Sequence, residues 1–222
     1  MYVLGIDCAT AACSAAICHD EEIISRQYEE MGRGQAEALV PMIERVLSAA
    51  GRKAMDLDLI ASTVGPGAYT GVRIVLSTAQ ALSLAASVPL AGVTTFEAIA
   101  RAQGLQTRGM LVALETKRAD IYVQYFDKNG YPASKPAAVE ESTLPDLFPD
   151  QSLRIAGDAG ERAATVLRAT GRDIELTGGP VLPDATWVAR LAGERFATGD
   201  IMAAEPMYLR PPDVGPPRKR RA

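Results

Sequence analysis

The chain has 222 residues, of which 48% are hydrophobic and 23% charged, so it is long enough to bury a core in one large domain or two small lobes. Its formal net charge of −4 excludes the whole-chain basic character that marks many nucleic-acid-binding proteins. No apolar run reaches the roughly 20 residues that a membrane span needs, and MYVLGID lacks the basic start of a signal peptide, so we expect neither a span nor an export signal.

The first thirty residues predict an antiparallel meander. Three short β-prone runs, separated by small polar links, cover Tyr2–Asp7, Ser14–Cys18 and Ile23–Tyr28. The sequence CHDEE lies between the second and third runs and holds the only histidine, His19. A turn histidine is expected to be solvated, which argues against zinc catalysis and Ser-His-Asp chemistry.

The three cysteines of the chain, Cys8, Cys13 and Cys18, all fall in this meander. An odd count without an export signal indicates a reducing compartment. Residues five apart in a strand face opposite sides, so we expect separate buried thiols and favour this over a metal or redox site.

A helix is predicted over Gln35–Ala50, where apolar residues recur at the helical period, and Gly51 is expected to cap its end. Pro41 lies inside this pattern and predicts an irregular first turn or a kink. The apolar positions are Leu39, Val40, Ile43, Val46, Leu47 and Ala50.

Strands and helices then alternate, which predicts an α/β layer fold. Leu57–Val64 is a nearly continuous apolar run typical of a buried strand. The sequence GPGAYTGVRI follows and leads into a helix predicted over Thr70–Ala86. Further elements are expected at Pro89–Val93, a strand, and Thr95–Ala102, a helix.

The second half repeats the start of the first. VLGIDCATAACSAAI and LVALETKRADIYVQYF each combine a strand, an acidic residue, a polar turn and a second strand, so that Glu115 corresponds to Asp7. A strand in IAGDAG and helices over Arg162–Ala169 and Thr186–Ala197 follow. We therefore predict a first lobe at 1–104, a smaller second lobe at 105–210, and an extended or disordered tail at 211–222, which is rich in proline and basic residues.

The turn after the first strand and the GPGAYTGVRI loop together form a candidate phosphate site. A carboxylate could orient a hydrated magnesium ion, and turn amides with a helix N-terminus could face phosphate oxygens. The loop matches neither the P-loop nor the dinucleotide-binding pattern, so the glycines could equally serve tight turning and close packing, with Thr70 as a helix N-cap. The candidate residues are Asp7, Thr10, Gly65, Gly67, Thr70 and Gly71.

Four segments, LGIDCAT, ALVPMIERVL, GPGAYTGVRI and EPMYLRPP, together resemble the TsaB (YeaZ) family of tRNA threonylcarbamoyladenosine synthesis, over residues 2 to about 212. The resemblance implies a two-lobed actin-like ATPase (ASKHA) fold with mixed sheets flanked by helices, and a cytoplasmic location. It also implies a non-catalytic subunit in the synthesis of N6-threonylcarbamoyladenosine at position 37 of ANN-decoding tRNAs. This subunit would stabilise the TsaD transferase together with the TsaE ATPase.

The resemblance also indicates whether this chain binds a metal ion or a cofactor. The catalytic sibling TsaD carries a His-x-x-x-His metal helix, and the two histidine positions fall here on Thr95 and Ile99; a further sibling histidine corresponds to Gln35. We therefore expect no metal site and no cofactor of the chain's own, with ATP and magnesium at most at the junction of the complex.

The family pairs with TsaD through its first-lobe helices, which implies an interface here, although the same residues could simply be core. A homodimer through this surface is also plausible, and a TsaC-type enzyme would make the threonylcarbamoyl-adenylate. Contact with tRNA is expected through the complex, and RKRR at 218–221 could touch its phosphates. The interface residues would be Leu39, Val40, Ile43, Val46, Leu47, Val72, Val75 and Ala79.

Two other functions compete with this one. The chain could be a stand-alone actin-like ATPase or small-molecule kinase that uses Asp7 and the loop at Gly65. Against this, Glu115 followed by Lys117 and Arg118 is more typical of a solvated charged hairpin than of a catalytic base. A peptidase is disfavoured by the single histidine and the absence of a G-x-S-x-G sequence.

Overall fold

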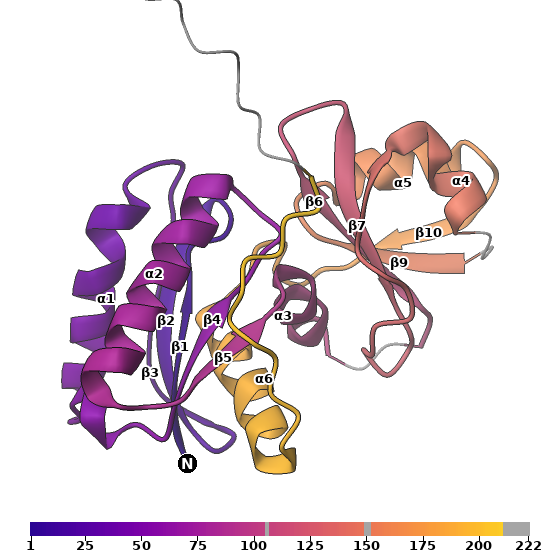
Figure 1. The fold of residues 1–222 in the computed structure, drawn as a ribbon. Coiled ribbons are helices and arrows are strands. Elements are labelled where there is room, and N and C mark those ends of the chain that lie inside the picture. The colour runs from indigo at the N-terminus through magenta and orange to yellow at the C-terminus, as the bar shows by residue number, and fades with distance from the viewer. Residues whose placement is uncertain (105–106, 149–151, 211–222) are drawn as a thin grey trace, which may run out of the picture.

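The computed structural model describes residues 1–104, 107–148 and 152–210, so the predicted tail at 211–222 lies outside the described residues. Its strands form two five-stranded sheets in two lobes that lie side by side (Figure 1). Across the described ranges, no helix is long and apolar enough to cross a membrane.

The first sheet has the strand order β3-β2-β1-β4-β5. β1, β2 and β3 pair in antiparallel fashion, which confirms the predicted meander, and β4 and β5 continue from β1 in parallel. Helices α1 and α2 cover one face and α6 covers the other (Figure 1), which explains the nearly continuous apolar runs of β1 and β4. The elements are β1 (Tyr2–Asp7), β2 (Ala12–His19), β3 (Glu22–Glu30), α1 (Gln35–Ala49), β4 (Leu59–Thr63), α2 (Tyr69–Ala86) and β5 (Leu90–Val93).

The second sheet repeats this topology with the order β10-β9-β6-β7-β8. An antiparallel meander of β6, β7 and β8 is again extended in parallel, by β9 and β10. Asp7 ends β1 and Glu115 ends β6, so the internal duplication predicted from the sequence is confirmed. The elements are β6 (Met110–Glu115), β7 (Asp120–Phe126), β8 (Ala137–Glu140), α4 (Leu144–Leu147), β9 (Ser152–Ala156), α5 (Gly160–Arg168) and β10 (Asp173–Leu176).

Each lobe gives its last helix to the other lobe. Helix α3 (Thr95–Ala102) follows the first sheet, yet its Phe96 packs with Met110 of the second sheet. Helix α6 (Ala185–Thr198) follows the second sheet, yet Val188 packs with Val3 of the first. The predicted boundary of 105–210 for the second lobe is therefore wrong at its C-terminal end, because α6 buries its apolar face on β1 and β4.

Most predicted elements are confirmed within two residues at each end, and three details differ. Pro41 lies within a continuous α1, where an irregular first turn or a kink is predicted, whereas Gly51 follows the C-cap in the left-handed conformation, as expected of a capping glycine. Thr70 is not an N-cap, because α2 already begins at Tyr69 and its N-cap is Ala68. Sequence analysis missed the short elements β8, α4 and β10.

The prediction that the cysteines lie apart is wrong for one pair. The antiparallel register of β1 and β2 aligns Asp7 with Ser14, so Cys8 and Cys13 stand opposite each other at the next position. Their sulfur atoms are 2.9 Å apart in the buried core, whereas Cys18 lies in a different cluster, against α6. The strand-period argument failed because a turn, and not a continuous strand, separates the two residues.

Helix α6 approaches β1 closely at Gly5. A Cβ atom there would lie 2.2 Å from the carbonyl oxygen of Ala185 and 2.7 Å from the amide nitrogen of Ala189. We expect Gly5→Ala to lower the free energy of unfolding by about 3 kcal/mol or more, because backbone atoms must move. Denaturant unfolding measures this loss.

Gly193→Ala is the matched control for this prediction. Its Cβ would lie 3.3 Å from the flexible end of Met1, and alanine favours a helix interior over glycine by about 0.5–1 kcal/mol. Equal stability losses in the two variants would contradict the close approach of α6 to β1.

Candidate functional site

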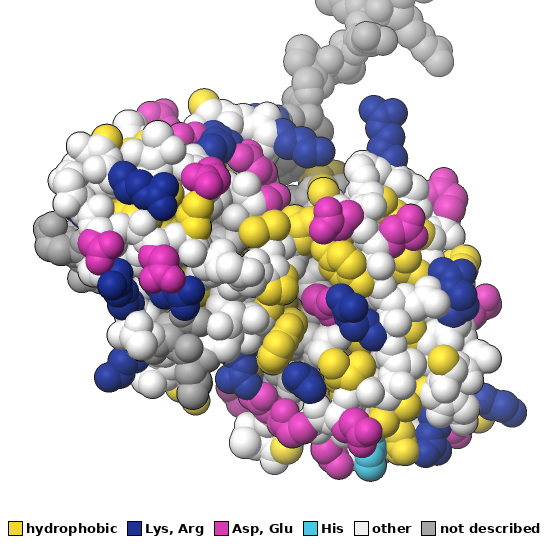
Figure 2. Space-filling model, turned by 180° about the vertical axis from the view of Figure 1, so that it is seen from behind, with side chains coloured by type: hydrophobic (Ala, Val, Ile, Leu, Met, Phe, Trp, Pro, Cys, Tyr) yellow, Lys and Arg dark blue, Asp and Glu magenta, His cyan; other side chains and the backbone are white. Residues whose placement is uncertain are grey.

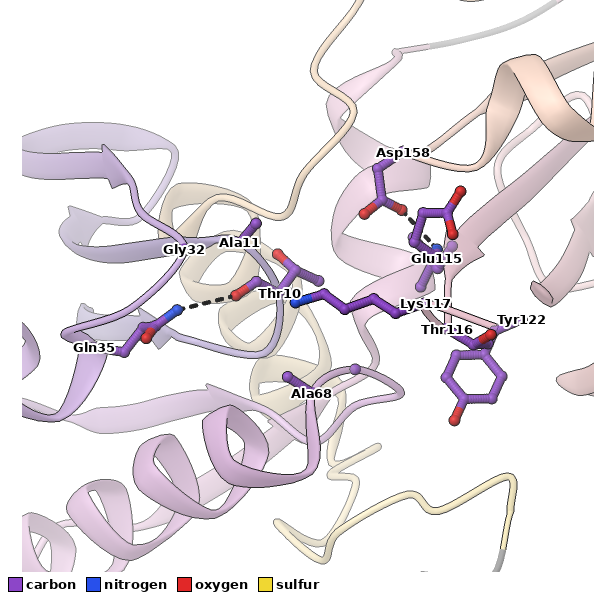
Figure 3. Close-up of a pocket in the computed structure, with 12 residues that line it drawn as sticks. Thr10, Ala11, Gly32, Gln35, Ala68, Glu115, Thr116, Lys117, Tyr122 and Asp158 are labelled. Carbon is purple, nitrogen blue, oxygen red and sulfur yellow. Dashed lines mark hydrogen bonds between the residues drawn. The ribbon is translucent and has the colours of Figure 1, made fainter. Parts of the chain in front are cut away.

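A pocket of about 160 Å³ lies between the lobes, where the ends of β1 and β6 face each other (Figure 3). The first lobe contributes the turn after β1, the N-terminus of α1 and the loop before α2. The second lobe contributes the turn after β6 and the start of the turn after β9. The lining residues are Thr10, Ala11, Gly32, Gln35, Gly67, Ala68, Leu114, Glu115, Thr116, Lys117, Tyr122 and Asp158.

Lys117 is the cation of this pocket. Its side chain extends across the gap toward Thr10 of the opposite lobe (Figure 3), and its backbone adopts φ +60°, which is uncommon for a residue with a side chain. Arg162 holds the turn in place, since it pairs with Glu115 and donates to the carbonyl oxygen of Arg118. Asp158 also binds this turn, because its carboxylate accepts from the amide of Glu115 at 2.9 Å.

These contacts correct the interpretation of Glu115 as part of a solvated hairpin. Glu115 is half-buried and paired with Arg162, and it lines the interlobe pocket. Lys117 and Arg118 are exposed, as a hairpin tip would be. Glu115 is the counterpart of Asp7, as the repeated sequence pattern predicts, and the ends of their strands, β6 and β1, meet at this junction.

Asp7 does not face the pocket. Its Oδ1 accepts hydrogen bonds from the Ala9 amide at 3.0 Å and the Thr63 hydroxyl at 2.6 Å, and its Oδ2 is buried without a partner among the described residues. Burial raises the pKa of Asp7 to about 7, although both hydrogen bonds oppose the shift. The carboxylate therefore fixes the turn after β1 from within.

The glycine loop packs directly on the turn after β1. A Cβ at Gly67 would lie 2.0 Å from the carbonyl oxygen of Ala9, and one at Gly71 would lie 2.1 Å from that of Cys8. The Ala68 amide donates to the same Ala9 oxygen at 2.7 Å. Of the two interpretations of these glycines, the contacts support close packing.

The pocket does not fit a nucleotide with its magnesium ion. Sites for molecules of that size usually occupy about 300–1,000 Å³. The interlobe pocket is about 160 Å³, Lys117 crosses it, and Asp7 is buried and does not line it. The Ala68 amide, which a phosphate would need, is already paired.

The structure brings together only part of the predicted site. Thr10 and Gly67 line the pocket, whereas Asp7, Gly65 and Gly71 are buried behind it. Thr70 is exposed and lines a second cavity of about 310 Å³ at the N-termini of α1 and α2. This second cavity shares three lining residues with the pocket, Gly32, Gln35 and Ala68.

Six of the eight predicted interface residues are core residues of the chain itself. They are buried because the apolar stripes of α1 and α2 face the sheet, so they offer no surface to a partner. Only Val40 is exposed, at 48%, and Leu47 is half-buried. The six core residues are Leu39, Ile43, Val46, Val72, Val75 and Ala79.

The outer face of the same helix pair carries other apolar side chains. Leu84 of α2 is 83% exposed; Met55, which is 69% exposed, lies outside the pair on a short 3-10 helix (Ala54–Asp56) that contacts α2. Small residues Ser77 and Ala81 are exposed between the ends of α2. An interface on α1 and α2 stays a prediction, and the residues available for it are those of this outer face.

The side of the molecule opposite to α1 and α2 exposes apolar residues at a different place. There, hydrophobic side chains gather along the junction of the lobes, with charged residues around them (Figure 2). Glu97 of α3 and Arg195 of α6 form an ion pair at this junction. Burial would raise the pKa of Glu97, but the paired guanidinium and the Thr94 contacts outweigh it, so this pKa lies below its ordinary value.

The two positions on which the resemblance places the sibling's metal-binding histidines lie in the core. Thr95 and Ile99 are both fully buried in α3, and Ile99 packs with Met110 and Phe126 of the second sheet. Within the described part of the chain, no group of three or more His, Cys, Asp or Glu side chains could hold a metal ion.

Comparison with known proteins places this geometry in a family. The model of the family "TsaD: tRNA N6-adenosine threonylcarbamoyltransferase" matches residues 21–141. The tRNA threonylcarbamoyladenosine biosynthesis protein TsaB of Escherichia coli K12 is 28% identical over 230 residues, which cover 95% of each chain. The crystal structure of YeaZ from Pseudomonas aeruginosa superposes with a TM-score of 0.81 and 28% identity, over 94% of this chain and 99% of that one.

More distant structures share the fold alone. A ROK hexokinase of Thermus thermophilus has a TM-score of 0.52 at 14% identity, over 89% of this chain and all of that one. The duplicated sheets and their flanking helices are therefore those of the actin-like ATPase fold, as the resemblance implied.

Proposed function

Because this chain belongs to the TsaB (YeaZ) family of tRNA threonylcarbamoyladenosine biosynthesis, we propose that it is the non-catalytic subunit that binds and stabilises the TsaD transferase. The complex would modify the adenosine at position 37 of ANN-decoding tRNAs in the cytoplasm. The TsaE ATPase would dock near the junction, and a TsaC-type enzyme would supply threonylcarbamoyl-adenylate. This chain would reach tRNA through its partners.

The main support for this proposal is that the outer face of α1 and α2 exposes apolar side chains. Val40 and Leu84 are exposed on neighbouring helices that together cover one side of the first sheet (Figure 1). A partner that laid two helices against this pair would bury these side chains and form a helix bundle, and the small residues of α2 would let the backbones approach closely. A second copy of this chain could use the same face when TsaD is absent.

The proposal also assigns the chain no catalytic step. The interlobe pocket is small, Asp7 is internal, and Thr95 and Ile99 replace the sibling's metal ligands. A nucleotide of the complex would instead bind where a partner closes over the larger cavity at the N-termini of α1 and α2. There, the two helix N-termini favour an anion, while the lining side chains Arg33 and Glu37 carry opposite charges.

Reconstitution with purified components tests this function. TsaD, TsaE and the TsaC-type enzyme of the same organism would be incubated with tRNA, ATP, threonine and bicarbonate, with and without this chain. The modified adenosine is then quantified after nuclease digestion. Formation of the nucleoside is expected to need the chain, and an equal yield without it would contradict the proposal.

The isolated chain is expected to bind ATP weakly, with a dissociation constant above about 1 mM, and to show no turnover above a buffer control. Calorimetry with ATP and magnesium measures the first and phosphate release the second. Lys117→Ala removes the side chain that crosses the pocket, and its ATP binding is compared with that of the wild-type chain. Micromolar binding by the wild-type chain would favour the alternative of a stand-alone ATPase or kinase.

A peptidase function has less support. His19 ends β2 and stacks on the ring of Tyr2 at 4.3 Å, beside Asp20 and away from the pocket. Neither serine nor cysteine lines the interlobe pocket.

A further inference from the structure

We propose that Cys8 and Cys13 form a reversible intramolecular disulfide that acts on the start of α2. The two thiols flank the turn after β1, and their sulfur atoms are 2.9 Å apart. A disulfide bond is about 2.05 Å long, so less than 1 Å of sulfur movement separates the dithiol from the bonded state.

The end of the strand pair brings the two cysteines together. Asp7 and Ser14 are the last aligned pair of β1 and β2, and Cys8 and Cys13 are the next residue along each side of the turn. Residues directly opposite in an antiparallel pair have Cα atoms about 4.5–5.5 Å apart. Disulfides form across Cα separations of about 4.4–6.8 Å, a range that includes this spacing, so a small adjustment of the turn is enough.

The third cysteine has no comparable neighbour. Cys18 faces α6, where its sulfur lies 4.0 Å from the carbonyl oxygen of Thr186. It belongs to a different core cluster from Cys8 and Cys13. The proposal therefore predicts one pairing among the three that three cysteines allow.

The turn between the two cysteines borders the interlobe pocket. Thr10 and Ala11 lie in the turn between the two cysteines and line this pocket, and Ala11 is exposed. Both thiols are buried, and the Cys13 hydrogen bond together with burial raises the pKa of Cys8. Oxidation is therefore expected to be slow and to require a small opening of the turn.

The chemistry is a two-electron oxidation by a peroxide. One sulfur, as its thiolate, attacks an oxygen of hydrogen peroxide; an S–O bond forms, the O–O bond breaks, and hydroxide leaves. The second sulfur then attacks the first, the S–S bond forms, and the S–O bond breaks with loss of a second hydroxide. The two thiol protons convert both hydroxides to water, and a dithiol reductant reverses the change.

The bond would act on α2 through the backbone of the turn. The carbonyl oxygen of Cys8 packs against Gly71, and that of Ala9 packs against Gly67, so closely that a Cβ at either glycine would clash. The Ala9 oxygen also accepts a hydrogen bond from the Ala68 amide. A shift of Cys8 is therefore passed to the first turn of α2, next to the outer face that we propose for partner binding.

Redox titration of the full chain tests the pairing. Folded protein and protein in urea would be equilibrated in the same series of oxidised and reduced glutathione, then acid-quenched, alkylated and mapped by mass spectrometry. Folding is expected to favour the Cys8–Cys13 disulfide at least about tenfold, because it holds the sulfurs together. Cys18→Ser should keep this product and Cys13→Ser should lose it.

Slow access of the oxidant to the buried thiols could hide the equilibrium, so the titration is run from both the reduced and the oxidised state. One sample starts from reduced folded protein and the other from protein refolded in the presence of oxidised glutathione. A common end point without the disulfide, or a bridge to Cys18, would overturn the proposal.

Hydrogen exchange tests the link to α2. Oxidation should change the exchange of amides 67–72 and leave those of α6 unchanged. Unchanged exchange at 67–72 would overturn the coupling to α2.

Discussion

Asp7→Asn is expected to make the protein more stable above about pH 7, by up to about 4 kcal/mol, since each unit of pKa shift corresponds to about 1.4 kcal/mol. Asp7 is fully buried, and burial raises its pKa from 3.8 to about 7. Asparagine keeps an oxygen that can accept from the Ala9 amide and the Thr63 hydroxyl, and it removes the buried charge.

The sign of this effect follows from proton binding. Between the unfolded pKa of 3.8 and the folded pKa of about 7, the folded chain holds the Asp7 proton more tightly than the unfolded chain does. The contribution of Asp7 to stability therefore falls as the pH rises through this range, and above the folded pKa the penalty is complete. In Asp7→Asn, this pH-dependent loss of stability should be absent.

Urea unfolding of both proteins from about pH 4 to pH 8 measures the difference. The gain of Asp7→Asn should be small near pH 4 and grow toward pH 8, so the low-pH measurement is the internal control. A constant difference across the range would mean that Asp7 is not the buried acid described here, and a loss of stability at pH 8 would show that its charge is needed.

The second large effect is expected on partner binding. Val40→Asp and Leu84→Asp place a charge on the outer face of α1 and α2, at side chains 48% and 83% exposed in the isolated chain. Each should weaken binding to TsaD at least about 100-fold, or about 2.7 kcal/mol, because the charge would be desolvated at the interface. The stability of the isolated chain should hardly change.

Leu147→Asp is the matched control, since this leucine is 49% exposed but lies on α4 of the second lobe. Ile43 and Val75 would be poor choices, because both are buried and a charge there would unfold the chain. Calorimetric titration of TsaD with each variant gives the affinities. Equal losses from Leu147→Asp and Leu84→Asp would place the interface elsewhere.

The sequence predicted the architecture because its hydrophobic patterns are strong and local. The helix from Gln35 has a clear helical period, Tyr2–Asp7 is a short apolar run, and the repeated strand, acid and turn predicted two related sheets. The exchange of α3 and α6 between lobes could not be predicted, because an amphipathic helix such as Ala185–Thr198 does not specify which sheet it covers. The short strand Asp173–Leu176 was missed because four residues carry too little periodicity.

The candidate site was predicted less well than the fold. The pattern in GPGAYTGVRI indicates a tight glycine turn, but it does not tell whether the space beside Gly67 holds a ligand or the Ala9 carbonyl. The sequence around Lys117 predicts only a charged hairpin, because its place in the pocket depends on how the first lobe packs against the second. The apolar positions of α1 predict an interface as readily as a core, because sequence periodicity does not separate a core stripe from a docking stripe.

Light scattering after gel filtration, on this chain mixed with TsaD of the same organism, tests the central claim most directly. We predict a new species whose mass is the sum of the two chains, or a multiple of that sum, with both proteins in its peak. Separate elution at micromolar concentration, even with ATP, magnesium and TsaE present, would contradict the assignment of this chain as the subunit that binds TsaD.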